Sequence, residues 1–311
     1  MLLIYDKMFN LILETGIIPQ NWSKGVIIPI YKNKGHPTSP NNYRPITLLS
    51  CISKLFTSVL NARLNKFLDE NNILNENQAG FRKHHSTTDH IFTLHSIIEI
   101  LRHHKKKIFC TYIDFSKAFD SVWRVGMWQK LLKYNVNGNF FQVVKSMYHN
   151  IKSCVQSVNP QDQNDPNSSH FSEYFTSNIG VRQGENLSPI LFSLFLNDLE
   201  EYLINKNNNG INLSEYTHDT DLLPLLKILV LLYADDTVLL ANDHLSLQKS
   251  LNDFMEFCTQ WKLEVNIEKT KVVIFGARNT NGYNFFINGS NIEIVDSYKY
   301  LGIFFSKTSN F

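Results

Sequence analysis

The sequence is poor in cysteine. Its 311 residues hold four cysteines, widely spaced and without a Cys-x-x-Cys pair: Cys51, Cys110, Cys154 and Cys258. This excludes a disulfide framework and the usual zinc spacings, so we expect four small buried residues. The doublets His84-His85 and His103-His104 lack ligand spacing to a cysteine, and we expect solvated or locally bonded rings there.

Long apolar runs are also missing. The most apolar stretch, residues 222–234, is short and is interrupted by Pro224 and Lys227. Because a membrane-spanning helix needs about 20 apolar residues, this stretch predicts a buried strand and the segment that leads into it. The first 13 residues are amphipathic and contain Asp6 and Lys7, unlike a signal peptide. We therefore expect an intracellular chain that does not cross a membrane.

The net charge is small as well. Lys and Arg number 30 and Asp and Glu 28, which leaves +2 and by itself predicts no affinity for nucleic acid. The sum conceals an asymmetry, because residues 1–153 hold 20 basic and 9 acidic side chains while residues 154–311 hold 10 and 19. Such a contrast indicates a polyanion partner, although solvated faces produce the same pattern. Acidic residues outside any motif, such as Glu200 and Glu201, are expected to be solvated.

Apolar periodicity predicts helices mixed with short strands. Helices are expected over residues 2–16, 50–71, 87–104, 122–134, 140–149, 187–204 and 245–261, and strands over 26–31, 108–113, 229–233, 237–240, 272–275, 285–288 and 300–304. The proline-containing segment 32–45 predicts a loop, and the Asn-, Ser- and Pro-rich segment 159–169 an exposed insertion. No internal repeat is present. Helices mixed with hairpins indicate an α+β fold instead of a regular βαβ array.

The strongest local pattern is a pair of adjacent carboxylates, Asp235 and Asp236, between two apolar runs. A tight hairpin turn at this point would favour Asn-Gly or Asp-Gly, because its central residues need positive φ. Two like charges beside apolar surface are costly unless cations compensate them. A hard divalent cation such as magnesium prefers oxygen ligands of this kind.

A third carboxylate, Asp114, closes the apolar run 108–113. If that strand lies beside the 229–240 hairpin, Asp114 joins Asp235 and Asp236 at one strand end. Three carboxylates can hold two metals about 3.5–4 Å apart, as in-line phosphoryl transfer requires. Taken alone, Asp114 suits the N-cap of the following helix, but the neighbouring Asp-Asp hairpin favours the metal-ligand interpretation.

Several motifs surround these carboxylates. In chain order they are Asn42-Tyr43-Arg44-Pro45-Ile46, Asn77-Gln78-Ala79-Gly80-Phe81-Arg82, Ile113-Asp114-Phe115-Ser116-Lys117-Ala118-Phe119-Asp120, Gly180-Val181-Arg182-Gln183-Gly184, Tyr233-Ala234-Asp235-Asp236, Asn266 with Lys269-Thr270, and Tyr300-Leu301-Gly302. The Tyr-Ala-Asp-Asp box resembles the catalytic box of reverse transcriptases. The whole set, in this order, is similar to the motifs of LINE-type, non-LTR retrotransposons and covers nearly the whole chain.

The resemblance implies a right-hand polymerase fold with fingers and an antiparallel palm sheet in one reverse transcriptase domain, residues 1–311. The fingers would comprise roughly residues 1–107 with part of 140–185, and the palm 108–139 and 186–311. Because the last motif lies close to the final residue, the thumb is expected to be missing. We likewise expect neither an endonuclease domain before the fingers nor a zinc knuckle after the palm. We therefore expect a fragment of a larger element protein or a degraded copy.

The resemblance makes Asp114, Asp235 and Asp236 ligands of two Mg²⁺ ions, with Mn²⁺ as a possible substitute. One ion would lower the pKa of the primer 3′-hydroxyl, and the other would neutralise the leaving pyrophosphate. Lys269 is expected near the leaving phosphates as a general acid. Lys271, expected on the same face of a strand, is the alternative.

Further residues would bind substrate by resemblance. Arg82 would hold the triphosphate through its planar donor fork, although it also suits a solvated surface position. Arg44 would contact template or phosphate, although Arg-Pro also suits an exposed turn. Phe119 would form a steric gate that excludes a 2′-hydroxyl by bulk; by pattern alone it suits a core position. Gln183 and Gly184 would lie near the nucleotide sugar and template base.

Other features follow from the same comparison. Tyr300, Leu301 and Gly302 would form the primer grip. After Gly184, Glu185-Asn186 replaces the family's small residue or Asp followed by Pro, which affects the shape of this turn and not the fold. A basic face would line the template path by phosphate neutralisation, although each member also suits a solvated position: Lys24, Lys32, Lys34, Lys54, Arg63, Lys66 and Lys105-Lys106-Lys107.

The sequence therefore predicts an RNA-directed DNA polymerase domain. Its partners would be an RNA template, a DNA primer and dNTPs; protein partners are not indicated, and a nuclear location follows only from the resemblance. Two alternatives stay open: an inactive remnant that only binds RNA, and a viral-type RNA-dependent RNA polymerase. Ala234 in the box and the bulk of Phe119 disfavour the RNA polymerase, and the three intact carboxylates disfavour inactivation by substitution.

Overall fold

The computed structural model describes residues 2–158, 169–214, 216 and 227–308. Its elements fall into two compact units, one of residues 1–73 and 122–194 and one of residues 74–121 and 195–311. Helices accompany sheets of mixed pairing, which confirms the predicted α+β class. The predicted insertion 159–169 lies outside the described residues except for Ser169. The apolar segment 222–226, predicted to lead into the strand, lies wholly outside them.

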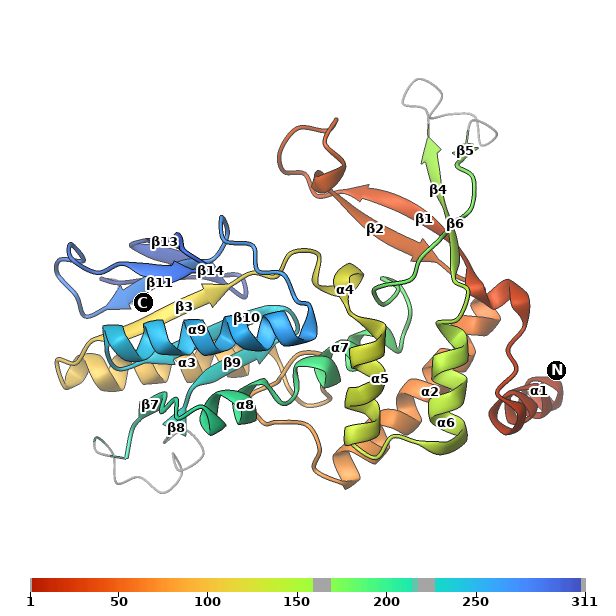
Figure 1. The fold of residues 1–311 in the computed structure, drawn as a ribbon, viewed down its shortest axis with the longest axis horizontal. Helices are drawn as coiled ribbons and strands as arrows, with labels where there is room; N and C mark the ends of the chain where they lie inside the picture. Colours follow the sequence, from red (N-terminus) through yellow and green to blue (C-terminus); the bar gives the residue numbers. More distant parts are fainter. Residues whose placement is uncertain (1, 159–168, 215, 217–226, 309–311) are drawn as a thin grey trace. The chain divides into compact units, whose positions relative to one another are not determined.

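The first unit contains a five-stranded sheet (Figure 1). Its strands are β1 (Lys24–Tyr31), β2 (Tyr43–Leu48), β4 (Lys152–Val158), β5 (Ser169–Phe171) and β6 (Phe175–Thr176). β1 forms an antiparallel hairpin with β2 and pairs in parallel with β4. The loop predicted over 32–45 was too long, because β2 begins at Tyr43. Pro45 lies opposite Pro29 in the hairpin, where the edge strand β2 tolerates a residue without an N–H donor.

Helices complete the first unit. They are α1 (Leu2–Thr15), the 3₁₀ helices η1 (Gln20–Ser23) and η2 (Pro40–Asn42), α2 (Cys51–Glu70), α5 (Arg124–Lys133), α6 (Gly138–Met147) and most of α7 (Ser188–Leu196). α2 buries Phe56, Leu60, Leu64 and Leu68 at four-residue spacing, as an amphipathic helix should. Cys51, in the first turn of α2, is exposed, whereas the other three cysteines are buried as predicted.

The second unit contains a six-stranded sheet of order β12-β13-β11-β3-β10-β9. Its strands are β3 (Ile108–Ile113), β9 (Val230–Tyr233), β10 (Asp236–Ala241), β11 (Lys271–Phe275), β12 (Phe285–Ile287) and β13 (Ser290–Ile294). β3 pairs antiparallel with both β10 and β11, and all six of its residues are buried. The run 108–113 is uniformly apolar or small because it forms a central strand covered on both faces.

Helices α3 and α9 run alongside this sheet (Figure 1). The remaining elements of the unit are α3 (Thr87–His103), α4 (Ala118–Ser121), α8 (Leu199–Asn205), α9 (His244–Trp261), and the strand pairs β7 (Ile211–Asn212) with β8 (Lys227–Ile228) and β14 (Ser297–Tyr300) with β15 (Ile303–Ser306). Cys110 and Tyr112 join the apolar core formed with α3. Phe115 is an odd number of residues from Cys110 and Tyr112, and its ring centroid lies 5.9 Å from that of Phe254 in α9.

Two further predicted elements differ from the structure. The helix expected over 187–204 is interrupted at Asn197-Asp198, so α7 and α8 are separate. The strand expected over 300–304 is a hairpin that turns at Leu301 and Gly302, which have φ of +47° and +94°. Among the helices of the described residues, none combines the length and the apolar character needed to span a bilayer.

Candidate functional site

Strand register brings two of the predicted carboxylates to one place. Thr237 of β10 lies opposite Ile113 of β3 in an antiparallel ladder. The next pair in that register is Asp236 with Asp114. Residues directly opposite each other in such a pair project from the same face. Asp114 and Asp236 therefore stand at the same end of the sheet.

Asp235 lies in the turn that leads into β10. Tyr233 and Asp236 pair across a two-residue connection, Ala234-Asp235, and we call residues 233–236 the Asp-Asp turn. The sequence placed the turn on Asp235-Asp236, one residue too late. Ala234 takes up the left-handed conformation, with φ of +58°, at a position where glycine or asparagine is usual.

The three carboxylates interact electrostatically. Burial raises the pKa of Asp236 to about 6, and the charges of Asp235 and Asp114 add to the effect. Burial and the charge of Asp114 likewise raise the pKa of Asp235. Asp235 and Asp236 nevertheless remain exposed enough for solvent or a ligand to reach them. Neighbouring like charges that raise the pKa of Asp235 and Asp236 form a site that a bound cation would stabilise.

The turn that contains Lys269 is bonded directly to Asp114. The Asn266 N–H donates to the Asp114 carbonyl at 2.8 Å, and the Asp114 N–H donates to Thr270 Oγ1 at 3.3 Å. Lys269 Nζ lies 3.2 Å from Asp114 Oδ2. Lys271, by contrast, begins β11 and pairs with Glu293 at 2.8 Å. Lys269 precedes that strand, so the two lysines do not share a strand face.

The side chains at this strand end are of the chemical type that binds a divalent cation. Asp114, Asp235 and Asp236 offer hard oxygen ligands that repel one another in its absence. Within residues 2–158, 169–214, 216 and 227–308, no three His, Cys, Asp or Glu side chains are already arranged around one metal position. The three carboxylates therefore fit a divalent cation by their oxygen ligands and by their closeness to one another.

Phe119 lies beside Phe81. Their rings meet edge to face, with centroids 6.2 Å apart, and Phe81 is exposed with φ of +63°. Phe119 follows Asp114 by five residues and is half-buried. The structure thus joins the motif of Asp114 to the motif of Arg82 through an aromatic pair.

Arg82 is directed towards its own loop. Its Nη1 donates to the Asn75 carbonyl at 3.0 Å and, at 3.4 Å, to the Gln78 carbonyl. Its Nη2 pairs with Glu76 Oε1 at 3.2 Å, and the Glu76 side chain is 81% exposed. One edge of the guanidinium is therefore fixed by the loop, while the other holds a solvent-facing carboxylate.

Arg44, Gln183 and Gly184 belong to the first unit. Arg44 is an exposed residue of β2, opposite Ile30. The Gln183 carbonyl accepts from the Thr47 N–H of the same strand at 2.8 Å. Gly184 has φ of +110°, and a Cβ there would lie 2.7 Å from the Thr47 carbonyl oxygen. The Arg44 and Gln183 motifs are thus adjacent.

The departure at Glu185 has a structural explanation that the sequence did not predict. Glu185 is buried and pairs with Arg182 at 3.0 Å, with side chains 0% and 5% exposed. The Tyr148 hydroxyl donates to the second Glu185 oxygen at 2.8 Å, and Arg182 also donates to the Trp22 carbonyl at 3.0 Å. Glu185 therefore supplies the charge that Arg182 needs inside the unit.

The β14–β15 hairpin contributes aromatic rings near the carboxylates. Tyr300 is buried, with its ring 5.6 Å from that of Tyr112. Tyr298 stacks on Tyr112 at 4.4 Å. Burial, with the charges of Asp114 and Asp236, raises the pKa of Tyr298 to about 12. Sequence reasoning missed Tyr298, because nothing in the motif 300–302 marks it.

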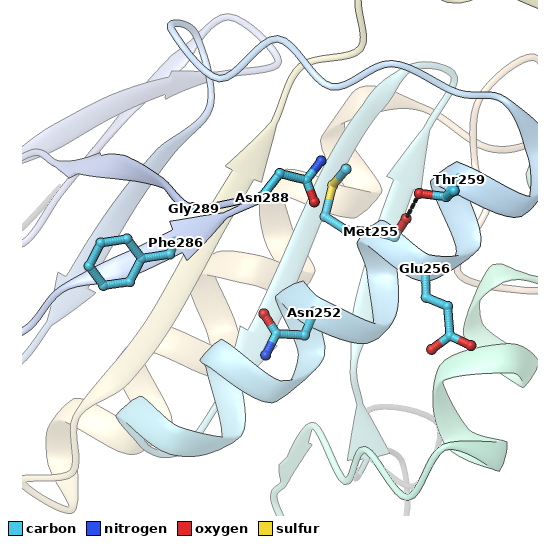
Figure 2. A pocket seen from close by; sticks show the side chains of 7 residues that line it. All are labelled: Asn252, Met255, Glu256, Thr259, Phe286, Asn288 and Gly289. Atoms are coloured by element: carbon cyan, nitrogen blue, oxygen red, sulfur yellow. Dashed lines mark hydrogen bonds between the residues drawn. The ribbon is translucent and has the colours of Figure 1, made fainter.

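A cavity of about 370 Å³ lies elsewhere in the second unit, between α9 and the β12–β13 hairpin (Figure 2). Its lining is mostly neutral, and its one acid, Glu256, pairs with Lys206 at 2.8 Å. The Thr259 hydroxyl donates to the Met255 carbonyl, as Figure 2 shows. The strand β12 lies at the far edge of the sheet from β10, so the cavity does not adjoin the Asp-Asp turn.

Comparison with known proteins agrees with these motifs. The family described as "Reverse transcriptase (RNA-dependent DNA polymerase)" matches residues 30–305. A probable RNA-directed DNA polymerase from transposon BS of Drosophila melanogaster is 30% identical, over 98% of this chain and 32% of that protein. The RNA-directed DNA polymerase from mobile element jockey of the same species is 27% identical, over 95% and 30%.

Solved telomerase structures share the fold. Apo telomerase from Candida tropicalis aligns with 98% of this chain and 52% of its own at a TM-score of 0.57 and 12% identity. Telomerase from Candida albicans aligns with 92% and 48% at a TM-score of 0.54 and 14% identity.

The chain belongs to the reverse transcriptase family, and its relatives make it a reverse transcriptase domain of the LINE type, which confirms the resemblance. It spans about a third of the length of those relatives.

Proposed function

We propose that this chain carries the polymerase site of an RNA-directed DNA polymerase, which joins dNTPs to a DNA 3′ end on an RNA template. One observation supports this most directly: the β3–β10 register sets Asp114 beside Asp236, with Asp235 adjacent. Burial and neighbouring charge raise the pKa of Asp235 and Asp236, which are still open to solvent, and such carboxylates at a strand end suit nucleotidyl transfer better than a structural role.

Asp114, Asp235 and Asp236 would hold two Mg²⁺ ions, or Mn²⁺ in their place. When bound, such ions activate the primer hydroxyl and neutralise the leaving pyrophosphate. Lys269, beside Asp114, would hold the leaving phosphates and donate a proton to them as a general acid. Before substrate binds, its charge offsets part of the carboxylate repulsion.

Two aromatic rings and one guanidinium would receive the nucleotide. Phe119, backed edge to face by Phe81, would exclude a 2′-hydroxyl by bulk. Arg82 would exchange the exposed Glu76 for a phosphate oxygen while its loop contacts stay in place. The exchange is accessible because the Glu76 side chain is open to solvent, while the Arg82 side chain, 13% exposed, is held by its loop.

The two units would divide the remaining tasks. The six-stranded sheet with its carboxylates would be the palm, and the β14–β15 hairpin with Tyr300, Leu301 and Gly302 its primer grip. The first unit would supply fingers elements, with Arg44 near template or phosphate. Gln183 and Gly184 would lie near the nucleotide and template. We propose that these residues form part of a longer polymerase, since the relatives extend well beyond the matched region.

A primer-extension assay on an RNA template tests the function. Wild type should incorporate dNTPs only with Mg²⁺ or Mn²⁺, and Asp235→Asn should lower the rate about a thousand-fold or more, since a metal ligand is lost. Asp243→Asn is the matched control, because Asp243 caps α9 and asparagine caps equally well. RNA binding without incorporation by wild type would favour an inactive remnant, and equal rates for wild type and Asp235→Asn would refute the site.

A further inference from the structure

Residues 75–82, which we call the edge segment, are bonded to the end of β9. The Leu232 N–H donates to the Asn77 carbonyl at 2.8 Å, and the Ala79 N–H donates to the Leu232 carbonyl at 3.0 Å. Gln78 and Leu232 thereby form a parallel bridge. Because β9 is the last strand of the six-stranded sheet, the edge segment continues the sheet beside the Asp-Asp turn.

The side chain of Gln78 connects the edge segment to that turn. Gln78 is fully buried, and its Oε1 accepts from the Gly80 N–H at 3.0 Å and the Ala234 N–H at 3.2 Å. Both partners are donors, so the amide oxygen and not the nitrogen must face them. Ala234 is the residue whose left-handed φ of +58° shapes the turn. Gln78 therefore binds the strained residue that immediately precedes Asp235.

The edge segment and the Asp-Asp turn come into close backbone contact at Gly80. A Cβ added at Gly80 would lie 2.2 Å from the Ala234 nitrogen and 3.0 Å from the Tyr233 carbonyl carbon. Only glycine permits this contact, and its own φ is not positive. Gly80 is thus required for proximity, and the short distance is what allows Gln78 to reach the turn.

A buried carboxylate holds the other end of the edge segment. Glu200 of α8 accepts from Asn75 Nδ2 at 2.7 Å and from Asn77 Nδ2 at 2.6 Å. Asn197 Oδ1 accepts from the Asn75 N–H at 2.8 Å. Glu200 was expected to be solvated, and the structure contradicts this because its oxygens have two amide donors. The edge segment is consequently fixed at both ends.

We propose that Gln78 is a positioning residue for the polymerase site: it holds Ala234 in its left-handed conformation and so fixes the direction of Asp235 and Asp236. The inference rests on the proposed function. It assigns to Gln78 a role that requires no contact with nucleotide, primer or metal, since its side chain is sealed from solvent.

The variant Gln78→Met removes the acceptor and keeps the length of the side chain. Amide hydrogen exchange at Ala234 and Gly80 should accelerate about ten-fold or more as the hydrogen bond is lost. Turnover should fall about ten- to a hundred-fold while the KM for dNTP stays within about three-fold, because the loss concerns alignment.

The matched control is Gln248→Met in the same unit. Gln248 bonds the Phe286 backbone through both Oε1, at 2.8 Å, and Nε2, at 2.9 Å, away from the Asp-Asp turn. Its loss should leave turnover and Ala234 exchange unchanged. Equal effects of the two variants would show a general loss of structure and would overturn the proposal.

A second substitution separates positioning from folding. Glycine adopts positive φ without strain, so Ala234→Gly in the Gln78→Met background should restore part of the lost turnover. Unchanged Ala234 exchange in Gln78→Met, a loss confined to KM, or no recovery with Ala234→Gly would each contradict the proposal. If wild type incorporates no nucleotide, the function proposed above fails, while the exchange measurement still decides whether Gln78 holds the turn.

Discussion

At the scale of single residues, the site depends on a conformation that its sequence does not favour. A left-handed residue other than glycine costs about 1–2 kcal/mol, and Ala234 occupies such a conformation next to Asp235. Asp235 and Asp236 add mutual repulsion beside apolar strands. Strain and repulsion of this kind persist only where surrounding contacts outweigh them, and Gln78 with Gly80 provides such contacts.

Gly80→Ala tests how tightly these contacts are packed. The new Cβ would meet backbone atoms of Tyr233 and Ala234, which cannot rotate away, so the free energy of unfolding should fall by about 3 kcal/mol. Urea denaturation of the full chain measures this loss. Gly282→Ala is the control, since Gly282 has positive φ but open space and should lose only about 1 kcal/mol. Equal losses would mean that the backbone at Gly80 yields easily.

His90 predicts an acid-labile second unit. Burial lowers its pKa to about 4, an effect opposed by Asp89 and reinforced by His85. Its Nδ1 lies 3.4 Å from the Tyr300 hydroxyl, and its ring stands edge to face with Tyr233. In the unfolded chain the same ring protonates near pH 6.5, so between pH 6.5 and 4 only the unfolded state gains the proton. Stability should therefore fall by about 3 kcal/mol across this window and be unaffected above it.

Unfolding free energies at several pH values check this effect. His90→Gln should lose less stability than wild type between pH 6.5 and 4, whereas His170→Gln, at an exposed position of the first unit, should follow wild type. Parallel curves for wild type and His90→Gln would contradict the assignment to His90.

At the scale of elements, periodicity and motif spacing predicted much of the fold. The apolar run 108–113 predicts a buried strand ending at Asp114, and the structure makes it the central strand β3. The helices α2, α3 and α9 agree with their predicted ranges to within two residues at each end. These elements were predictable because each depends on its own local pattern.

What could not be predicted depends on partners distant in sequence. The register that places Asp114 beside Asp236 depends on how β3 and β10 pair. Gln78 and Glu200 have no local periodicity that marks them, and their roles arise from contacts more than a hundred residues away. Glu185 was recognised only as a departure, because its ion pair is visible only once Arg182 is buried.

The Glu185 pair supports a prediction about the turn that joins β6 to α7. Glu185→Gln leaves the buried Arg182 charge without its partner, which should cost about 3–5 kcal/mol of unfolding free energy. The double variant Arg182→Met with Glu185→Leu removes both charges and should recover most of that loss. Urea denaturation of Arg182→Met, Glu185→Leu and the double variant gives the coupling. Losses that simply add would show that the two side chains do not stabilise each other.

At the scale of the whole molecule, the charge asymmetry of the sequence follows the two compact units. The first unit holds 14 basic and 8 acidic side chains, a balance of +6, and the second holds 16 and 20, a balance of −4. The first unit is thus the one whose average charge attracts a polyanion. Under the proposed function, cations held by the carboxylates of the second unit would offset its negative charge and let phosphate approach.

Within the first unit, the end of the β1–β2 hairpin concentrates exposed positive charge. Lys32 and Lys34 lie in its loop and Arg44 on β2, all exposed, and the paired rings of Tyr31 and Tyr43 hold the strands together at 5.3 Å. If the three cations neutralise template phosphates, the triple variant Lys32→Ala, Lys34→Ala, Arg44→Ala should weaken RNA binding. The slope of log K against log salt should fall by about 2, since each single-strand phosphate contact contributes about 0.7.

The run Lys105-Lys106-Lys107, which the resemblance also assigns to the template path, offers the matched comparison. These three exposed lysines precede β3, at the opposite end of the strand from Asp114, which a six-residue strand places about 20 Å away. Replacing them with alanine removes the same charge, and fluorescence anisotropy with labelled RNA compares the two triple variants across a salt series. Hairpin-specific binding requires that the Lys105–Lys107 variant keep the wild-type slope. If both triple variants lower the salt slope equally, RNA binding depends on net charge alone. The prediction that the hairpin contacts the template would then be wrong.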